Sequence, residues 1–134
     1  MRRMVRKFME HAGWEVTEAA DGRTGLAQAR AERPDLILCD FEMPGFNGYQ
    51  MLAALRVADE TATIPFILMT GRPERAGVRQ TMELGADDYL EKPFDHSQLL
   101  KSVNARMARV EQVRRQAEQT LAALRGSTSA AVAR

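Results

Sequence analysis

Short runs of apolar residues that stop at a polar side chain constrain the fold of this chain more than any other feature. Residues 36–40 and 65–70 are such runs, and they end at Asp40 and Thr70, each followed by a loop rich in Pro and Gly. A run of this kind is typical of a buried strand in a parallel sheet. A third strand is predicted at 87–92, where Pro93 forces the chain out. Segments with apolar residues at helical spacing lie between the strands, so strand and helix alternate. This order predicts a doubly wound α/β fold with right-handed crossovers.

The remaining elements follow from the same patterns. Residues 14–19 alternate in the manner of a half-buried or edge strand, which makes a fourth strand. Helices are expected from the chain start to near Gly13, over 22–33, from Tyr49 to Val57, and around Val78 up to Gly85. Asp95 is a candidate N-cap with Gln98 at the reciprocal position of a capping box, and it opens a long final helix.

Composition narrows the classes of function. The 134 residues suit one domain of ordinary size, and a net charge of +1 gives no overall attraction to nucleic acid or to a membrane. Cys39 is the only cysteine, which suits a reducing cytoplasm and a small core residue rather than a reactive thiol. No apolar stretch has the length of a signal peptide or of a membrane span. We therefore expect a cytoplasmic protein, with no membrane or nucleic-acid partner.

Three polar side chains should meet at one edge of the predicted sheet. Asp40, Thr70 and Lys92 close three strands, and ligands of open α/β sheets bind at the carboxyl ends of the strands. A carboxylate, a hydroxyl and an ammonium together suit phosphoryl transfer, in which the carboxylate is the nucleophile. Each residue taken singly has a plainer interpretation: a turn cap for Asp40, a backbone hydrogen bond for Thr70 and a solvated position for Lys92.

The surrounding motifs resemble those of the receiver domain of two-component response regulators. The family pattern Asp-x-x-Met-Pro-x-x-Asn/Asp-Gly is matched by residues 40–48, Thr/Ser-Gly/Ala by Thr70-Gly71, and Gly-Ala-x-x-Tyr-x-x-Lys-Pro-Phe by residues 85–94. The resemblance implies a flavodoxin-like sheet, phosphorylation of Asp40 by a sensor histidine kinase or phosphotransfer protein, and switching through Thr70 and Lys92. It further implies that Tyr89 reports the switch to a downstream protein partner and that Lys92-Pro93 is a cis bond, which places Pro93 in a structural role. Glu42 and Arg72 flank the site and would set the lifetime of the phosphoryl group.

One part of the family pattern is missing. Receivers carry a first strand with an acidic pair that binds Mg²⁺ together with the phospho-acceptor, whereas this sequence begins within the expected first helix. Four strands are thus expected instead of five, and of the usual metal ligands only Asp40 and the Glu42 carbonyl remain. The strand's absence would leave its neighbours about 9.6 Å apart. An upstream start, a strand from another chain in a complemented dimer, and a sheet closed up as a four-stranded remnant are the alternatives.

The final helix is longer than a compact domain needs. The receiver core is expected over 1–94, the long helix over 95–125 and a disordered tail over 126–134. Apolar or small residues recur every seven positions along the helix, at Val103, Val110, Ala117 and Leu124. This spacing allows a short coiled coil and a homodimer. An exposed helical linker explains the helix equally well.

Three functions are compatible with these residues to different degrees. The first is a phosphoacceptor receiver that switches a binding surface, and the second is a pseudo-receiver that binds partners or dimerises without phosphate. The third is a phosphatase with an aspartyl-phosphate intermediate, but such enzymes carry a second Asp where this chain has Glu42 and an acidic pair where it has Pro93 and Phe94. We therefore expect a signalling protein and not an enzyme.

Overall fold

The computed structural model describes residues 2–131, with side chains as far as Arg125. Contacts divide the chain into two compact units, residues 1–102 and residues 103–134. The first unit contains the whole sheet and the predicted site residues. The second consists of the greater part of the final helix.

Three parallel strands form the sheet, in the order β1-β2-β3. They are β1 (Ile37–Asp40), β2 (Phe66–Thr70) and β3 (Asp88–Glu91). Every residue of β2 is buried, as its unbroken apolar sequence predicts for a central strand. Asp40 lies opposite Met69, and Thr70 lies opposite Glu91. The strands therefore bring their carboxyl ends to one edge.

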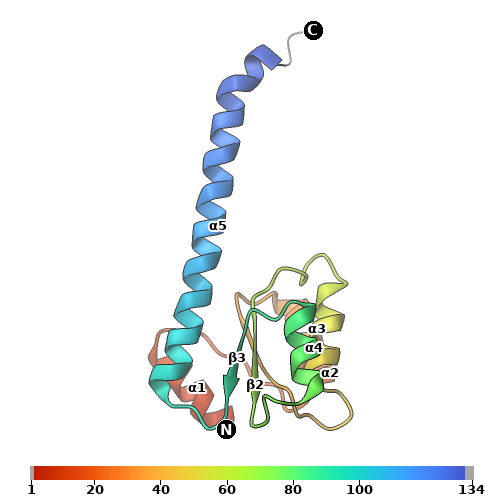
Figure 1. Cartoon of the computed structure of the whole chain (residues 1–134). Helices are drawn as coiled ribbons and strands as arrows, with labels where there is room; N and C mark the ends of the chain where they lie inside the picture. Colours follow the sequence, from red (N-terminus) through yellow and green to blue (C-terminus); the bar gives the residue numbers. More distant parts are fainter. Residues whose placement is uncertain (1, 132–134) are drawn as a thin grey trace. The chain divides into compact units, whose positions relative to one another are not determined.

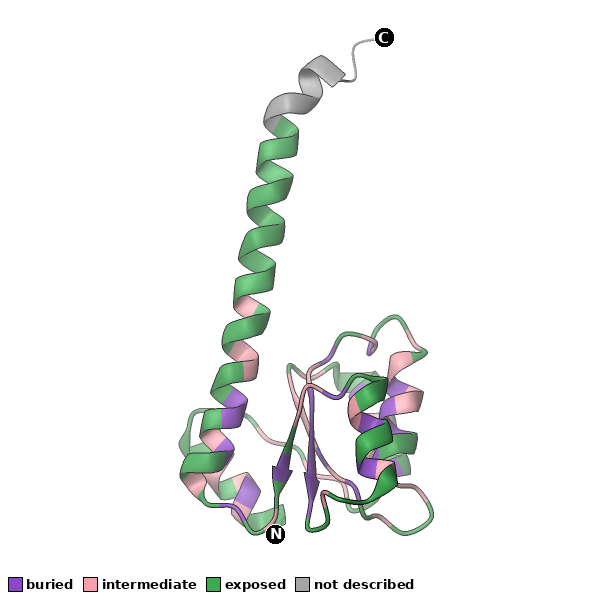
Figure 2. Ribbon diagram, viewed as in Figure 1, coloured by how far each residue is buried: buried purple, intermediate pink, exposed green. Residues whose placement is uncertain are grey.

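Helices cover both faces of this sheet. They are α1 (Arg2–His11), α2 (Gly22–Glu32), α3 (Gly48–Arg56), α4 (Ala76–Leu84) and α5 (His96–Ala131). Figure 1 shows α2, α3 and α4 on one face and α1 on the other. The buried residues in Figure 2 lie on the strands and on the helix sides turned toward them. The core on the face of α2, α3 and α4 includes Leu52, Leu55, Phe66, Leu68 and Val78.

The helix ends use the residues that their sequence predicts. Asp95 and Gln98 form the expected capping box, with backbone-to-side-chain distances of 2.8 and 2.9 Å in the two directions. Asn47 and Gln50 form a second one at the start of α3. The C-cap of α4 is Gly85, whose φ of 124° is open to glycine.

The strand predicted for residues 14–19 is wrong. No ladder forms there, so the sheet has three strands rather than four. Side chains hold the segment instead, because Arg6 pairs with Glu18 at 2.9 Å and Gln28 donates to the Glu18 carbonyl at 3.3 Å. A strand needs a neighbour for its backbone groups, and the described chain has none between this segment and β1. Alternation in the sequence could not reveal that missing neighbour.

A groove separates this segment from β1. It has a volume of about 510 Å³ and is lined on one side by residues 14–22 and on the other by residues 36–40. Among the described residues, no strand pairs with the outer edge of β1. The sheet therefore does not close up into a compact remnant, which removes one of the three alternatives for the missing strand.

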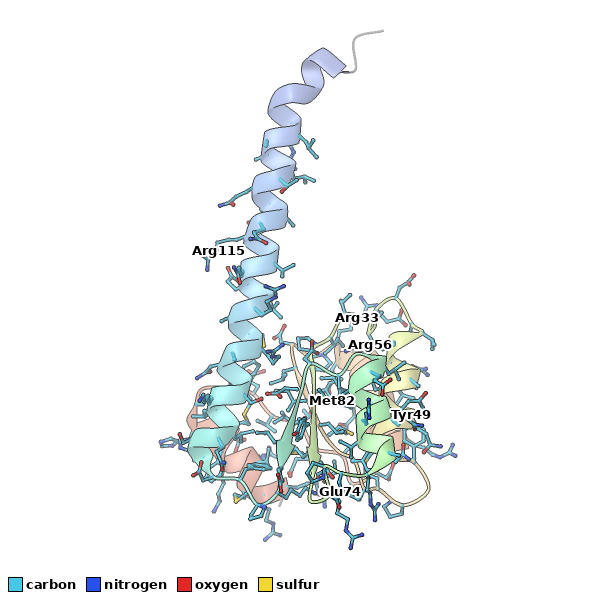
Figure 3. The ribbon with its side chains drawn as sticks, in the orientation of Figure 1. Arg33, Tyr49, Arg56, Glu74, Met82 and Arg115 are labelled. Atoms are coloured by element: carbon cyan, nitrogen blue, oxygen red, sulfur yellow. The ribbon has the colours of Figure 1, made fainter. Side chains whose placement is uncertain are left out.

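A partly buried arginine joins the far ends of α3 and α4 to the sheet. The Arg56 guanidinium donates to the Ile64 carbonyl at 2.9 Å and to the Gly85 carbonyl at 3.3 Å, and it lies 3.7 Å from Asp87 (Figure 3). Burial lowers the pKa of Arg56 from its ordinary value, and the charge of Asp87 partly opposes this. These contacts fix the edge of the sheet opposite the predicted site.

The final helix α5 extends to Ala131. The disordered tail predicted for 126–134 includes residues outside the described part, so it stays a prediction, as do the other predicted domain limits. No helix in residues 2–131 is long and apolar enough to cross a membrane.

Replacing Gly48 with Ala should destabilise the fold. A Cβ at this position would lie 2.6 Å from Leu68 Cδ1 and 3.1 Å from the Phe41 Cα. The Phe41 Cα atom belongs to the backbone and cannot move aside easily. We therefore expect a loss of about 1–3 kcal/mol in the free energy of unfolding, measured by urea denaturation. Gly71→Ala is the matched control, because its Cβ would meet nothing within 4 Å. Equal stabilities for the two variants would contradict the close approach.

Cys39 should be an unreactive thiol. Burial, and then the neighbouring Asp40 charge, raises the pKa of the Cys39 thiol to about 12. Only the thiolate attacks disulfides, so at about pH 8 the native thiol should react at least ~100-fold more slowly than in the urea-unfolded chain. Release of a chromogenic thiol from an aryl disulfide measures both rates. Similar rates in the two states would show that β1 is open to solvent.

Candidate functional site

Asp40 and Lys92 form an ion pair at the carboxyl edge of the sheet. Asp40 is the last residue of β1, and Lys92 follows directly after β3. The Lys92 Nζ atom lies 2.5 Å from Asp40 Oδ1, the buried oxygen of that carboxylate. Both side chains are about three-quarters buried, at 24% and 25% exposure. This shielding strengthens the interaction relative to one in open water.

Backbone pairing positions the two charged side chains. The Phe41 N–H donates to the Met69 carbonyl at 2.8 Å, and the Lys92 N–H donates to the Thr70 carbonyl at 2.7 Å. Both bonds continue the ladders beyond the last strand residues. The central strand β2 therefore fixes the ends of β1 and β3 on either side of itself.

Thr70 is directed toward Glu42. Its hydroxyl donates to Glu42 Oε1 at 2.9 Å and accepts from the Arg72 backbone N–H at 3.0 Å. The Thr70 side chain is fully buried, whereas Glu42 is exposed. The structure thus brings three of the predicted residues, Thr70, Glu42 and Arg72, into one hydrogen-bonded group beside the Asp40–Lys92 pair.

The loop from Phe41 to Gly48 returns the chain to the end of β1. The Gly48 N–H donates to the Phe41 carbonyl at 3.0 Å, and Asn47 caps the helix that starts there. Phe41 itself is buried and packs closely against Gly77 of α4. The Met-Pro and Asn-Gly positions of the sequence motif therefore shape the loop around Asp40.

The other two predicted residues lie on β3 and in the segment that follows it. Tyr89 is on β3 and is 43% exposed, so its ring is open to a partner. The Lys92-Pro93 peptide is cis. Among the described residues, the cleft lined by Glu42, Met43, Pro44 and Asn47 also includes Arg75, which the sequence analysis did not name.

The acidic residues present do not make up a magnesium site. Magnesium needs several oxygen ligands in near-octahedral order, and in the described part of the chain no three His, Cys, Asp or Glu side chains cluster to hold a metal. Lys92 already contacts the buried oxygen of Asp40. The Asp40 carboxylate and the Glu42 carbonyl are the two donors that the sequence predicts, and they are too few.

Three other acidic residues near the ends of strands or helices are engaged elsewhere. Asp21 caps α2 by accepting from the Thr24 N–H at 2.8 Å, and this bond lowers the pKa of Asp21. Asp87 accepts from the Phe66 N–H at 2.7 Å, and Asp88 accepts from the Ser102 hydroxyl at 2.6 Å. None of the three substitutes for an acidic pair next to Asp40.

The sequence did not predict the bond between the Glu42 carboxylate and Thr70. It predicted the Glu42 carbonyl as a metal ligand and the Glu42 side chain as a modulator of phosphoryl lifetime. The two partners are 28 positions apart in the chain, so no local signal indicates their hydrogen bond. Only the pairing of β1 with β2 makes them neighbours.

Comparison with known proteins gives the family. The model of the response regulator receiver domain matches residues 1–104. The protein PilH of Pseudomonas aeruginosa is 41% identical over 101 residues, which cover 75% of this chain and 84% of PilH. Curated transcriptional regulators are also similar, but the chain spans less than half their length, for example 45% of CseB from Streptomyces coelicolor.

Solved structures agree with the sequence matches. The chemotaxis protein CheY4 of Vibrio cholerae has a TM-score of 0.73 and 34% identity, with 78% of this chain and 87% of that chain covered. The receiver domain of the sensor histidine kinase PA1611 from P. aeruginosa, which was solved with a magnesium ion in its active site cleft, has a TM-score of 0.69 and 27% identity over 75% of this chain and 82% of that chain. This chain therefore belongs to the response regulator receiver domains of two-component signalling, which are signalling and not catalytic modules.

Proposed function

We propose that this chain is a phosphoacceptor receiver in which Asp40 takes a phosphoryl group from a phosphohistidine. The observation that supports this most is the contact between Asp40 and Lys92, because it places a cation beside the one carboxylate at the carboxyl end of β1. The family implies a sensor histidine kinase as the donor. A cytoplasmic location belongs to the same proposal.

Phosphoryl transfer forms one phosphorus–oxygen bond and breaks one phosphorus–nitrogen bond. An Asp40 carboxylate oxygen attacks the phosphorus, the bond from phosphorus to the histidine nitrogen breaks, and the electron pair stays on the imidazole. The Lys92 ammonium lies where it can donate to a phosphoryl oxygen, which compensates the added negative charge. No other covalent step is needed.

Thr70 supplies the switch in this proposal. Its hydroxyl is bonded to Glu42 before phosphorylation, so it must leave that carboxylate to reach a phosphoryl oxygen on Asp40. Phosphorylation would then favour a second arrangement by adding a better acceptor and by repelling Glu42. The exposed Tyr89 on the adjacent strand would transmit the change to a downstream protein partner.

The groove beside β1 is where we place the metal ligands that this chain lacks. Its lining includes Asp21, Asp40 and Glu42, and among the described residues no strand pairs with the outer edge of β1. In our proposal an additional strand fills this groove and brings carboxylates next to Asp40. That strand comes from upstream sequence or from another chain, and the ability to accept phosphate depends on it.

A pseudo-receiver is the second candidate function. It is favoured by the lack of a metal-holding cluster of side chains among the described residues. Such a protein would bind its partner, or a second copy of itself, with the same affinity whether phosphoryl donors are present or not.

Phosphorylation of Asp40 can be tested by intact mass. With acetyl phosphate and magnesium chloride, we expect a chain extended at its start by a strand carrying two carboxylates to gain one phosphate. The Asp40→Asn variant of that extended chain should gain none, because its amide is not a nucleophile. The chain as it stands should gain much less, on the order of 100-fold more slowly, since it lacks the carboxylates. If the extended chain stays unmodified as well, the pseudo-receiver becomes the better description.

The bond between Thr70 and Glu42 can be tested by a double-mutant cycle. We expect Thr70→Val and Glu42→Ala to show a coupling of about 0.5–1.5 kcal/mol in the free energy of unfolding, because each removes one end of the same hydrogen bond. Urea denaturation of the two single variants and the double variant gives this value. Glu74→Ala is the control, since it removes an exposed carboxylate from the loop after β2 (Figure 3) and should show no coupling to Thr70→Val.

A further inference from the structure

The helix α5 exposes apolar side chains over a long stretch. Every side chain from Ala108 to Arg125 is exposed, apart from the half-buried Glu111. Val110 is 42% exposed and Leu121 is 52% exposed. An isolated helix is only marginally stable in water, and helices in proteins gain most of their stability by burying an apolar face.

The exposed apolar residues follow a heptad. With Val110, Ala117 and Leu124 at position d, position a is occupied by Met107, Arg114 and Leu121. One stripe of apolar or small side chains thus runs along the helix, and Arg114 is its single charged member. A solvated linker helix would be polar on all sides, so this stripe favours burial against another helix.

The charges beside the stripe suit an identical helix in parallel alignment. Arg106 lies directly before an a position, which is position g, and Glu111 lies directly after a d position, which is position e, five residues further along. In parallel coiled coils, a residue at g of one chain forms an ion pair with the residue at this e position of the other chain. Among the described residues, the Arg106 Nε atom is buried and has no hydrogen-bond partner, so it is the outer part of this side chain that a second copy would have to reach. Glu111 lies 2.5 Å from Arg114 and 3.7 Å from Arg115 of its own helix. Its carboxylate is therefore already placed among arginine side chains in the helical turn that would face Arg106 of the second copy.

We propose that α5 is a dimerisation helix that forms a parallel two-stranded coiled coil with a second copy of this chain through Met107, Val110, Ala117 and Leu121. In a parallel pair, identical residues meet, so each apolar layer is complementary to itself. The two Arg114 residues, one from each copy, fall in the same layer, and their like charges weaken the association. The long Arg114 side chain limits this cost because its charged end stays near Glu111. This pairing does not depend on phosphorylation of Asp40.

The two adjacent arginines provide a sharp test. Arg114 occupies an a position of the heptad, whereas Arg115 occupies the next position, which is not part of the stripe. Figure 3 shows Arg115 projecting to the side of α5. Sedimentation equilibrium of the full chain should give a reversible dimer, and Arg114→Leu should lower its dissociation constant about tenfold or more. Arg115→Leu makes the same chemical change and should leave the constant within about twofold. Equal effects of the two substitutions would overturn the proposed register.

A second pair of variants tests the opposite direction. Val110→Glu with Leu121→Glu places charges in the stripe and should weaken the dimer on the order of 100-fold. Gln112→Glu with Gln119→Glu adds the same charge on the opposite face and should leave the dimer intact. Circular dichroism checks that each variant stays folded. If the parent chain and Arg114→Leu both remain monomeric up to ~1 mM protein, α5 is a linker and the proposal fails.

Chain orientation needs its own measurement. Leu121→Cys should cross-link to itself under oxidising conditions, because residue 121 faces residue 121 of the second copy only when the helices run parallel. The buried Cys39 should not interfere, since its thiol stays protonated. A dimer that fails to cross-link at this position would overturn the parallel arrangement.

Discussion

The pairing of β2 with both of its neighbours is the interaction on which the site depends. β2 is wholly buried, and its backbone bonds to Phe41 on one side and to Lys92 on the other set the positions of the two strand ends. A slip of the register by one residue would turn every side chain of the shifted strand to the other face of the sheet. Asp40 and Lys92 are far apart in sequence and meet because both are registered against the same strand.

The carboxyl edge of the sheet holds two contacts that differ in burial. Asp40 and Lys92 are mostly buried and in direct contact, whereas Thr70 is bonded to Glu42, a residue at the protein surface. A buried hydroxyl that has an exposed carboxylate as its acceptor can exchange that acceptor at small cost in free energy. This difference is the physical basis of the switch that we propose, since a phosphoryl group on Asp40 would compete with Glu42 for one hydroxyl hydrogen.

The groove beside β1 and the final helix are the two surfaces on which our proposals depend. The outer edge of β1 has no partner strand among the described residues, and Val110 and Leu121 on α5 are exposed. In our proposals, the first is where a carboxylate-bearing strand completes the site of Asp40, and the second is where another copy binds. The groove belongs to residues 1–102 and the stripe to residues 103–134, so substitutions can alter either one without changing the residues of the other.

The sequence by itself determined the cores of β1 and β2, the cap of α5 and the placing of three polar residues at strand ends. Apolar runs gave β1 and β2, Asp95 with Gln98 gave the start of α5, and motifs placed Asp40, Thr70 and Lys92 at strand ends. These features depend on residues close to one another along the chain. Residues 14–19 show the limit, since alternation predicts a strand but only a neighbouring backbone can make one. The bond from Thr70 to Glu42 and the contact from Lys92 to Asp40 were likewise decided by the tertiary structure, because strand register, and not local sequence, sets the distances between them.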